Sequence, residues 1–311
     1  MTNMPEDLIR ERLAPNAGQL RVVLDTDTYN EVDDQFAVVH ALLSPQRIRL
    51  EAIHAAPFHN DRSAGPADGM ARSYDEILRL LTRLGVTDHS RVLRGADRYL
   101  PSRSTAVASD AAYHLIELSK TGDTPLYVAA IGAITNVASA ILLDPTIVER
   151  IVVVWLGGQP TYWPSAREFN LKQDVPAAQV VFDSGVPLVQ IPCATVASHL
   201  LTTLAELAQY VQPQGDIGQY LFDICQSYGK DHFAWSKEIW DISATGWLID
   251  AAWVPSNIVP SPILTDQVTW SVDVSRHPIR IAHGVRRNQI FGDLFDKMAR
   301  FARGELAPSW D

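Results

Sequence analysis

Four aspartates lie within ten residues of one another near the start of the chain. Asp25 and Asp27 close the apolar run RVVLDTD, and Asp33 and Asp34 follow in NEVDDQF, which leads into a helical pattern. Carboxylates this close repel one another unless something positive neutralises them. Ca²⁺ and Mg²⁺ take about six to eight oxygen ligands and favour carboxylates, carbonyls and water. The spacing therefore predicts a site for a hard divalent cation, with a solvated acidic loop and helix-capping aspartates as the alternative.

The elements around these aspartates favour a shared site. Asp25 and Asp27 are two residues apart, so on an extended strand they point to one face, at the carboxyl end where open α/β sheets bind ligands. Asp33 and Asp34 open the following helix, whose dipole stabilises a carboxylate by about 0.3–1 kcal/mol. That contribution is too small to hold three or four charges together without a cation.

Strand-like and helical segments alternate over most of the chain. The pattern predicts an α/β fold with a mainly parallel open sheet flanked by helices. After about residue 200 it changes to helical segments and then two strand-like runs, and no Pro/Gly/Ser-rich linker intervenes. We therefore expect one domain over residues 1–311, with a helical C-terminal cap region and an N-terminal extension over residues 1–20. The strand-like runs are RVVLDTD, RLEAIHAA, RVLRG, PLYVAAIG, RIVVVWLGG and PLVQIPCAT.

Composition narrows the class of protein. The 311 residues are 47% hydrophobic, enough for a large core, and carry a net charge of −10. That charge argues against a nucleic acid polymer as partner and fits a cation and a small neutral substrate. The two cysteines, Cys193 and Cys225, form neither a disulfide framework nor a CxxC pair. Because no signal-peptide pattern or long apolar run occurs, we predict a cytoplasmic, soluble protein without membrane partners.

Taken together, the acidic loop, GAITN and REFN resemble the inosine/uridine-preferring nucleoside hydrolase superfamily. The resemblance runs from about Arg21 to the final helix. The family has an aspartate-rich DxD...DD loop after its first strand, and here this loop reads DTDTYNEVDD. Five residues, Thr28 to Val32, separate the second aspartate from the pair where the family usually has three. This sequence is therefore similar to a divergent branch.

Three further segments carry the resemblance. LYVAAIGAITN is similar to a family strand whose last carbonyl binds calcium, a role that would fall to Ile131. REFN resembles the segment whose glutamate and asparagine hold ribose hydroxyls, which implies that role for Glu168 and Asn170. EIWDISATGWL is similar to the helix whose His-Asp pair closes the calcium shell: Asp241 keeps the aspartate, and Trp240 replaces the histidine.

The resemblance implies a Ca²⁺-dependent hydrolase that cleaves the N-glycosidic bond of a ribonucleoside to ribose and free base. The implied Ca²⁺ ligands are Asp27, Asp34, the Ile131 carbonyl and Asp241, and Asp27 would also act as the general base on a metal-bound water. The remaining site residues are assigned by the same resemblance. Asp33 and Asn60 would bind ribose hydroxyls, Asp25 would orient the loop from behind the metal ligands, and Trp240 would stack on the base.

The group that activates the leaving base is open, because the family histidine is replaced here. Histidines and aromatic residues near the expected pocket are the possible contributors. These are His54, His59, Tyr162, Trp163, His232, Trp235 and Trp240.

Two other functions compete with a nucleoside hydrolase. The segment DTDT is also similar to the Mg²⁺ loop of haloacid-dehalogenase phosphatases, but Tyr29 departs from that motif, and Gly157 and Gly158 stand where acidic ligands are expected. A non-catalytic nucleoside or sugar binding protein of the same fold would fit the longer loop and Trp240. By resemblance alone we also expect a homo-oligomer.

Overall fold

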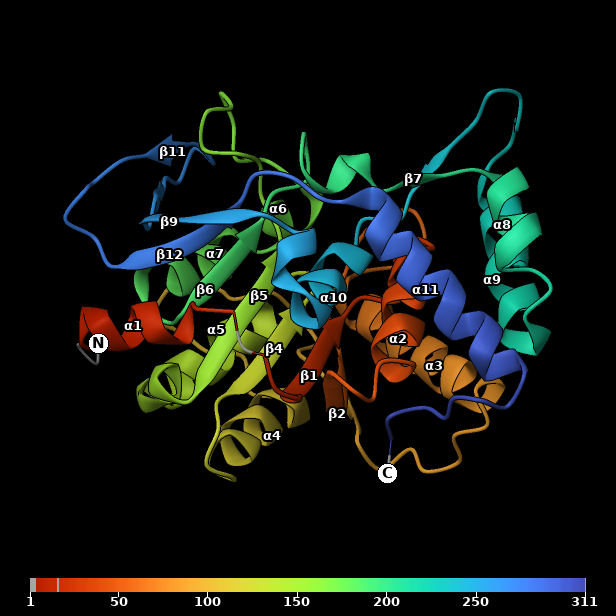
Figure 1. The fold of residues 1–311 in the computed structure, drawn as a ribbon. Helices are drawn as coiled ribbons and strands as arrows, with labels where there is room; N and C mark the ends of the chain where they lie inside the picture. The colour runs from red at the N-terminus through yellow and green to blue at the C-terminus, as the bar shows by residue number, and fades with distance from the viewer. Residues whose placement is uncertain (1–3, 16, 311) are drawn as a thin grey trace.

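The computed structural model describes residues 4–15 and 17–310. Its centre is an eight-stranded sheet with the order β3-β2-β1-β4-β5-β6-β12-β9, flanked by helices (Figure 1). The neighbouring strands from β3 to β12 pair in parallel, and β9 pairs antiparallel with β12. This sheet confirms the predicted fold class. The sheet strands are β1 (Leu20–Thr26), β2 (Ile48–Ala55), β3 (Val92–Arg94), β4 (Leu126–Ala130), β5 (Ile151–Leu156), β6 (Leu188–Ile191), β9 (Ser256–Pro260) and β12 (Pro278–Ala282).

The chain reverses its winding direction at the middle of the sheet. It moves outward from β1 through β2 to β3, then returns to β4 on the other side of β1 and moves outward again through β5 and β6. In open α/β sheets, ligands bind beyond the carboxyl ends of the strands at this switch point. Asp25 lies opposite Ala130 in the register of β1 and β4, and the Ile131 N–H donates to the Asp25 carbonyl at 2.8 Å. The first two aspartates and Ile131 therefore meet where this topology forms a crevice.

Buried apolar residues explain why these segments form the central layer. Every residue of β1, β4, β5 and β6 is buried, as expected for parallel strands covered on both faces. Helix α2 (Asp34–Leu42) is also buried along its whole length, whereas α3 (Pro66–Arg83) has one buried face. The other helices are α1 (Glu6–Arg12), α4 (Asp110–Ser119), α5 (Thr135–Leu143), α6 (Phe169–Gln173), α7 (Val175–Asp183), α8 (Leu204–Tyr210), α9 (Gly215–Tyr228), α10 (Ile242–Ile249) and α11 (Arg287–Ala302).

The C-terminal third does more than cap the sheet. Helices α8 and α9 lie to one side of the molecule in Figure 1. Helix α10 is buried throughout and begins directly after Asp241, and β9 and β12 extend the main sheet beyond β6. Short strand pairs complete the fold, β7 (Leu201–Thr202) with β8 (Lys237–Glu238) and β10 (Ile263–Leu264) with β11 (Trp270–Ser271). In the described ranges, none of the helices has the length and apolarity needed to cross a membrane.

Candidate active site

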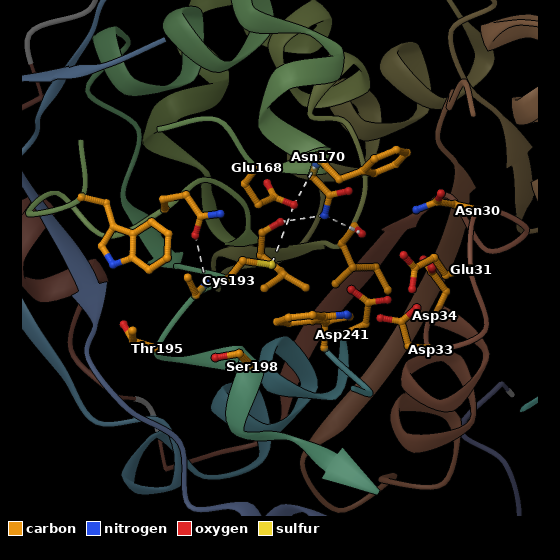
Figure 2. Close-up of a pocket in the computed structure, with 17 residues that line it drawn as sticks. Asn30, Glu31, Asp33, Asp34, Glu168, Asn170, Cys193, Thr195, Ser198 and Asp241 are labelled. Atoms are coloured by element: carbon orange, nitrogen blue, oxygen red, sulfur yellow. Dashed lines mark hydrogen bonds between the residues drawn. The ribbon is translucent and has the colours of Figure 1, made fainter. Parts of the chain in front are cut away.

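Three buried carboxylates from two helix starts form the centre of the site. Asp33 and Asp34 lie at the beginning of α2, and Asp241 immediately precedes α10. One carboxylate oxygen of each lies within 4.8 Å of the others, an arrangement that can hold a metal ion. Figure 2 shows these side chains gathered at one end of the pocket, with Glu31 beside them. Each charge is near an N-terminal helix end, but three carboxylates need more compensation than helix dipoles provide.

Asp27 lies behind this group and lacks partners of its own. Its side chain is fully buried, and neither carboxylate oxygen accepts a hydrogen bond. Burial, followed by the charges of Asp34 and Asp33, raises the pKa of Asp27 well above its ordinary value. The backbone leaves little room here, since a Cβ placed on Gly132 would lie 2.9 Å from the Asp27 Cγ. A buried carboxylate held in place without a donor fits a site for a cation.

Burial and mutual repulsion raise the pKa values of the carboxyl groups in this cluster. Burial and then the charge of Asp33 raise the pKa of Asp34 to about 8. Burial raises the pKa of Asp33 to about 6, and the ammonium of Lys237 opposes that rise. Lys237 is itself almost completely buried and forms an ion pair with Glu31 at 2.8 Å. One ammonium thus faces several carboxylates at this end of the pocket.

Glu168 and Asn170 form the wall opposite the acidic group. The Glu168 carboxylate accepts hydrogen bonds from the backbone N–H groups of Gly158, Asn170 and Leu171 at 2.8–3.1 Å, which fixes it at the start of α6. The Asn170 amide donates to the carbonyls of Ile131 and Leu156 at 3.1 and 2.9 Å. The carbonyl that the sequence assigned to the metal is therefore in contact with a residue assigned to ribose.

Asp25 is buried behind the loop and does not line the pocket. One of its oxygens accepts a hydrogen bond from the Asn136 amide at 2.9 Å, and the other has no partner. Burial raises the pKa of Asp25 to about 7, and the bond from Asn136 limits the rise. Asn136 also accepts from the Ala96 N–H at 2.8 Å. The position is that of a residue which supports the acidic loop.

The pocket that these residues line has a volume of about 520 Å³, within the range usual for small-molecule sites. It brings together most of the residues predicted to bind metal or substrate, with the exceptions of Asp27, Asp25 and Asn60. Trp163 is the other predicted contributor that reaches it. The lining residues are Asn30, Glu31, Asp33, Asp34, Ile131, Leu156, Gln159, Trp163, Glu168, Phe169, Asn170, Cys193, Ala194, Thr195, Ser198, Trp240 and Asp241.

Asn60 and the candidate histidines lie elsewhere. The Asn60 amide donates to the Asn30 side-chain oxygen at 2.6 Å, so it supports a lining residue. His54 is fully buried and its ring nitrogen lies 3.1 Å from that of His114. His232 contacts the Gln226 carbonyl at 3.0 Å. The assignment of Asn60 to the ribose stays a prediction. Of these two asparagines, Asn30 lines the pocket.

Sequence reasoning missed two groups of lining residues. Asn30 and Glu31 belong to the lengthened acidic loop, and its two additional residues were the available signal. Cys193, Thr195 and Ser198 follow β6, whose carboxyl end faces the same edge of the sheet. Thr195 has a φ of 62°, which is uncommon for a residue with a side chain, and its hydroxyl lies 2.7 Å from the Tyr162 hydroxyl. Strain of this kind is concentrated at functional sites.

The chain is similar to known proteins in sequence and in fold. The model for inosine-uridine preferring nucleoside hydrolases matches residues 22–297. The pyrimidine-specific ribonucleoside hydrolase RihB of Escherichia coli is 30% identical over 182 residues, which cover 57% of this chain and 56% of that relative. The chain therefore spans little more than half the length of this relative.

Solved structures with a similar fold include two hydrolases. The purine-preferring ribonucleoside hydrolase from Gardnerella vaginalis superposes with a TM-score of 0.73 at 20% identity, covering 91% of this chain and 99% of that one. An inosine-uridine preferring nucleoside hydrolase from Bacillus anthracis has a TM-score of 0.68 at 16% identity, covering 92% and 99%. At these identities the likeness concerns the fold.

Proposed function

This chain belongs to the inosine-uridine preferring nucleoside hydrolase family, and from that membership we propose that it hydrolyses the N-glycosidic bond of a ribonucleoside to ribose and free base. The observation that carries the proposal is the buried group of Asp33, Asp34 and Asp241 at one end of the pocket, with the unpartnered Asp27 behind it. Family membership also argues against a haloacid-dehalogenase phosphatase. A non-catalytic binding protein is distinguished by the assay described below.

We propose Ca²⁺ as the cation of this site. Asp27, Asp34, Asp241 and the Ile131 carbonyl would hold it, since hard oxygen donors of this kind suit Ca²⁺. Asp33 is close enough to Asp34 and Asp241 to serve as a ligand as well as to bind a ribose hydroxyl. When bound, the ion would orient a water molecule and lower its pKa.

The side chains around the ion have distinct roles in the proposal. Asp27 accepts the proton of the attacking water, which its two unpartnered oxygens allow. Glu168 and Asn170 hold ribose hydroxyls from the opposite wall, and Asp25 keeps the loop in position through Asn136. The ribosyl group becomes positively charged as the bond to the base breaks, and the surrounding carboxylates stabilise that charge.

Other parts of the proposal concern the whole chain. One continuous hydrophobic core extends from Met4 to Trp310 and supports a single domain. The homo-oligomeric state and cytoplasmic location are proposed on the resemblance and the composition alone.

The test is ribose release from a panel of purine and pyrimidine nucleosides, with Ca²⁺ and with a chelator. We expect turnover with Ca²⁺ and its loss on chelation. Asp34→Ala and Asp241→Ala should lose Ca²⁺ binding and turnover together while the circular dichroism spectrum is retained. Full turnover of either variant in chelator would contradict the metal site. Nucleoside binding by calorimetry without any ribose release would favour the binding protein.

A further inference from the structure

The pocket lacks the nitrogen bases and phenols that commonly protonate a leaving base. Among the residues that line it within the described part of the chain, there is no histidine, lysine, arginine or tyrosine. Burial, followed by the charge of Glu168, raises the pKa of the Cys193 thiol far above neutrality, so this thiol is a poor proton donor. The Thr195 and Ser198 hydroxyls are weaker acids still. Burial raises the pKa of Glu168, and three backbone N–H groups that donate to its carboxylate oppose the rise, so these donors hold its oxygens as acceptors.

The pocket is rich in carboxyl groups, which are ionised when a cation is bound. Five of its lining residues are carboxylates, namely Glu31, Asp33, Asp34, Glu168 and Asp241. Asp27 adds a further buried carboxylate behind them. Lys237 compensates one charge through its 2.8 Å pair with Glu31, and a bound divalent cation would still leave carboxylates in excess. A cleft lined by charges of one sign concentrates ligands of the opposite sign.

The apolar lining of the pocket suits a flat ring. Trp163 and Trp240 line the pocket together with Phe169 and Leu156. In Figure 2, Thr195 and Ser198 lie on the far side of the pocket from Asp33 and Asp34. Tryptophan faces stack on heteroaromatic rings and attract cations more strongly than other aromatic side chains do. These walls are therefore suited to an aromatic cation.

We propose that the preferred substrate is a ribonucleoside whose base carries a positive charge, such as a pyridinium riboside or an N-alkylated purine riboside. The inference rests on the proposed hydrolase function and specifies its substrate class. Water forms a new bond to C1′ and gives its proton to Asp27, which passes it to solvent. The C1′–N bond breaks, and its electron pair moves to the ring nitrogen and neutralises the base. The products are ribose, a neutral base and one proton, so no acid is needed.

The first test compares nicotinamide riboside and 7-methylguanosine with uridine and inosine in the presence of Ca²⁺. Ribose release gives kcat/KM for each nucleoside, and this value is divided by the rate of spontaneous hydrolysis because cationic nucleosides are less stable. We expect the normalised efficiency to be at least about tenfold higher for the two cations. From about pH 7 to 9, kcat for nicotinamide riboside, whose pyridinium charge does not depend on pH, should stay constant, because no general acid has to remain protonated.

The second test changes the pocket charge. Glu31→Gln should reduce the advantage of the cationic over the neutral nucleosides by about tenfold, through loss of one nearby negative charge. Glu31→Asp, which keeps the charge, should restore most of the advantage. Glu117→Gln is the matched control, since this carboxylate is exposed on α4 and pairs with Lys120 outside the pocket. Circular dichroism of each variant verifies that the fold is retained.

The outcomes separate the inference from the proposed function. If uridine and inosine are hydrolysed with the same normalised efficiency as the cations, or if kcat falls on the alkaline side, the substrate class is wrong and the hydrolase function stands. An unchanged advantage in Glu31→Gln would also overturn the inference. If none of the four nucleosides releases ribose, both the proposed function and the inference fail.

Discussion

The two ends of strand β1 place buried charges in opposite situations. At its start, the Arg21 guanidinium bonds both oxygens of Glu51 at 2.9 and 2.8 Å and also donates to the Thr121 hydroxyl and the Leu118 carbonyl. At its end, Asp25 has one oxygen without a partner and Asp27 has two. A strand of seven residues thus joins a satisfied ion pair to carboxylates that the protein itself does not satisfy.

Whether a buried charge has a hydrogen-bond or ion-pair partner distinguishes a structural residue from a functional one. A buried charge that is paired within the chain, as Arg21 is with Glu51, requires no ligand to compensate it. A buried charge without a partner is costly, and it is retained where a ligand supplies what is missing. The comparison predicts that changes at the two ends will separate stability from catalysis.

The largest effect is expected from Asp27→Asn. Loss of the proposed general base should reduce turnover by at least about 10³-fold. The metal-free protein should become more stable, because the buried Asp27 carboxyl must either stay charged without a partner or take up a proton, and asparagine avoids both costs. Ribose release and the midpoint of thermal unfolding in chelator measure the two effects. Asp296→Asn, an exposed change on α11, should leave both unaltered. Turnover retained by Asp27→Asn would remove the distinction between the two ends.

The opposite result is expected from Arg21→Met. Glu51 would keep its contact with the exposed Arg49 but lose its buried partner, and the free energy of unfolding should fall by about 3 kcal/mol. The kcat of the folded enzyme should not change. Urea unfolding provides the measurement. Arg10→Met removes an exposed pair with Glu6 and should cost less than about 1 kcal/mol. A large loss of kcat in Arg21→Met would contradict a purely structural role.

The carboxyl groups at the end of β1 should dominate the pH dependence of folding stability in the metal-free protein. Burial raises the pKa of Asp25 to about 7 and of Asp34 to about 8, from an ordinary value of 3.8. The folded form therefore binds more protons than the unfolded form between about pH 4 and 8, so stability is present at low pH and is lost as pH rises through that window.

We expect the free energy of unfolding in chelator to fall by about 6 kcal/mol from pH 5 to 8 through Asp25 and Asp34 together, since each tenfold change in proton affinity corresponds to about 1.4 kcal/mol. Thermal unfolding at several pH values provides the measurement. Saturating Ca²⁺ should reduce the slope, because the ion stabilises the ionised carboxylates. A stability that rises over this range in chelator would mean that these carboxyls are not protonated in the folded protein.

The smallest effect is expected from Asn60→Ala. Asn60 donates to Asn30 and does not line the pocket, so kcat/KM should fall by no more than about threefold. Asn170→Ala, which removes a pocket residue that also holds two carbonyls, should cost about a hundredfold. Steady-state kinetics with one nucleoside compares the pair. Equal losses would return Asn60 to the role that the sequence resemblance assigned.

The sequence predicted those parts of the site that follow from regular elements. The apolar run before Asp25 required a buried strand, which placed Asp25 and Asp27 at the carboxyl edge of the sheet, whereas the family resemblance supplied the place of Ile131. The positions of Glu31 and Thr195 depend on the path of loops, which neither periodicity nor composition determines. Strand β9 was missed for a similar reason: Ser256–Pro260 is partly exposed and has no continuous apolar run.

The close approach between Gly132 and Asp27 has a consequence for how this enzyme tolerates mutation. Any side chain at Gly132 would displace the Asp27 carboxylate, although Gly132 itself has no functional group. In a saturation screen scored by growth on a nucleoside as carbon source, substitutions at Gly132 should therefore be as damaging as those at Asp27. A glycine is needed at position 132 because of the space that it leaves for Asp27, and not because of any reactive group.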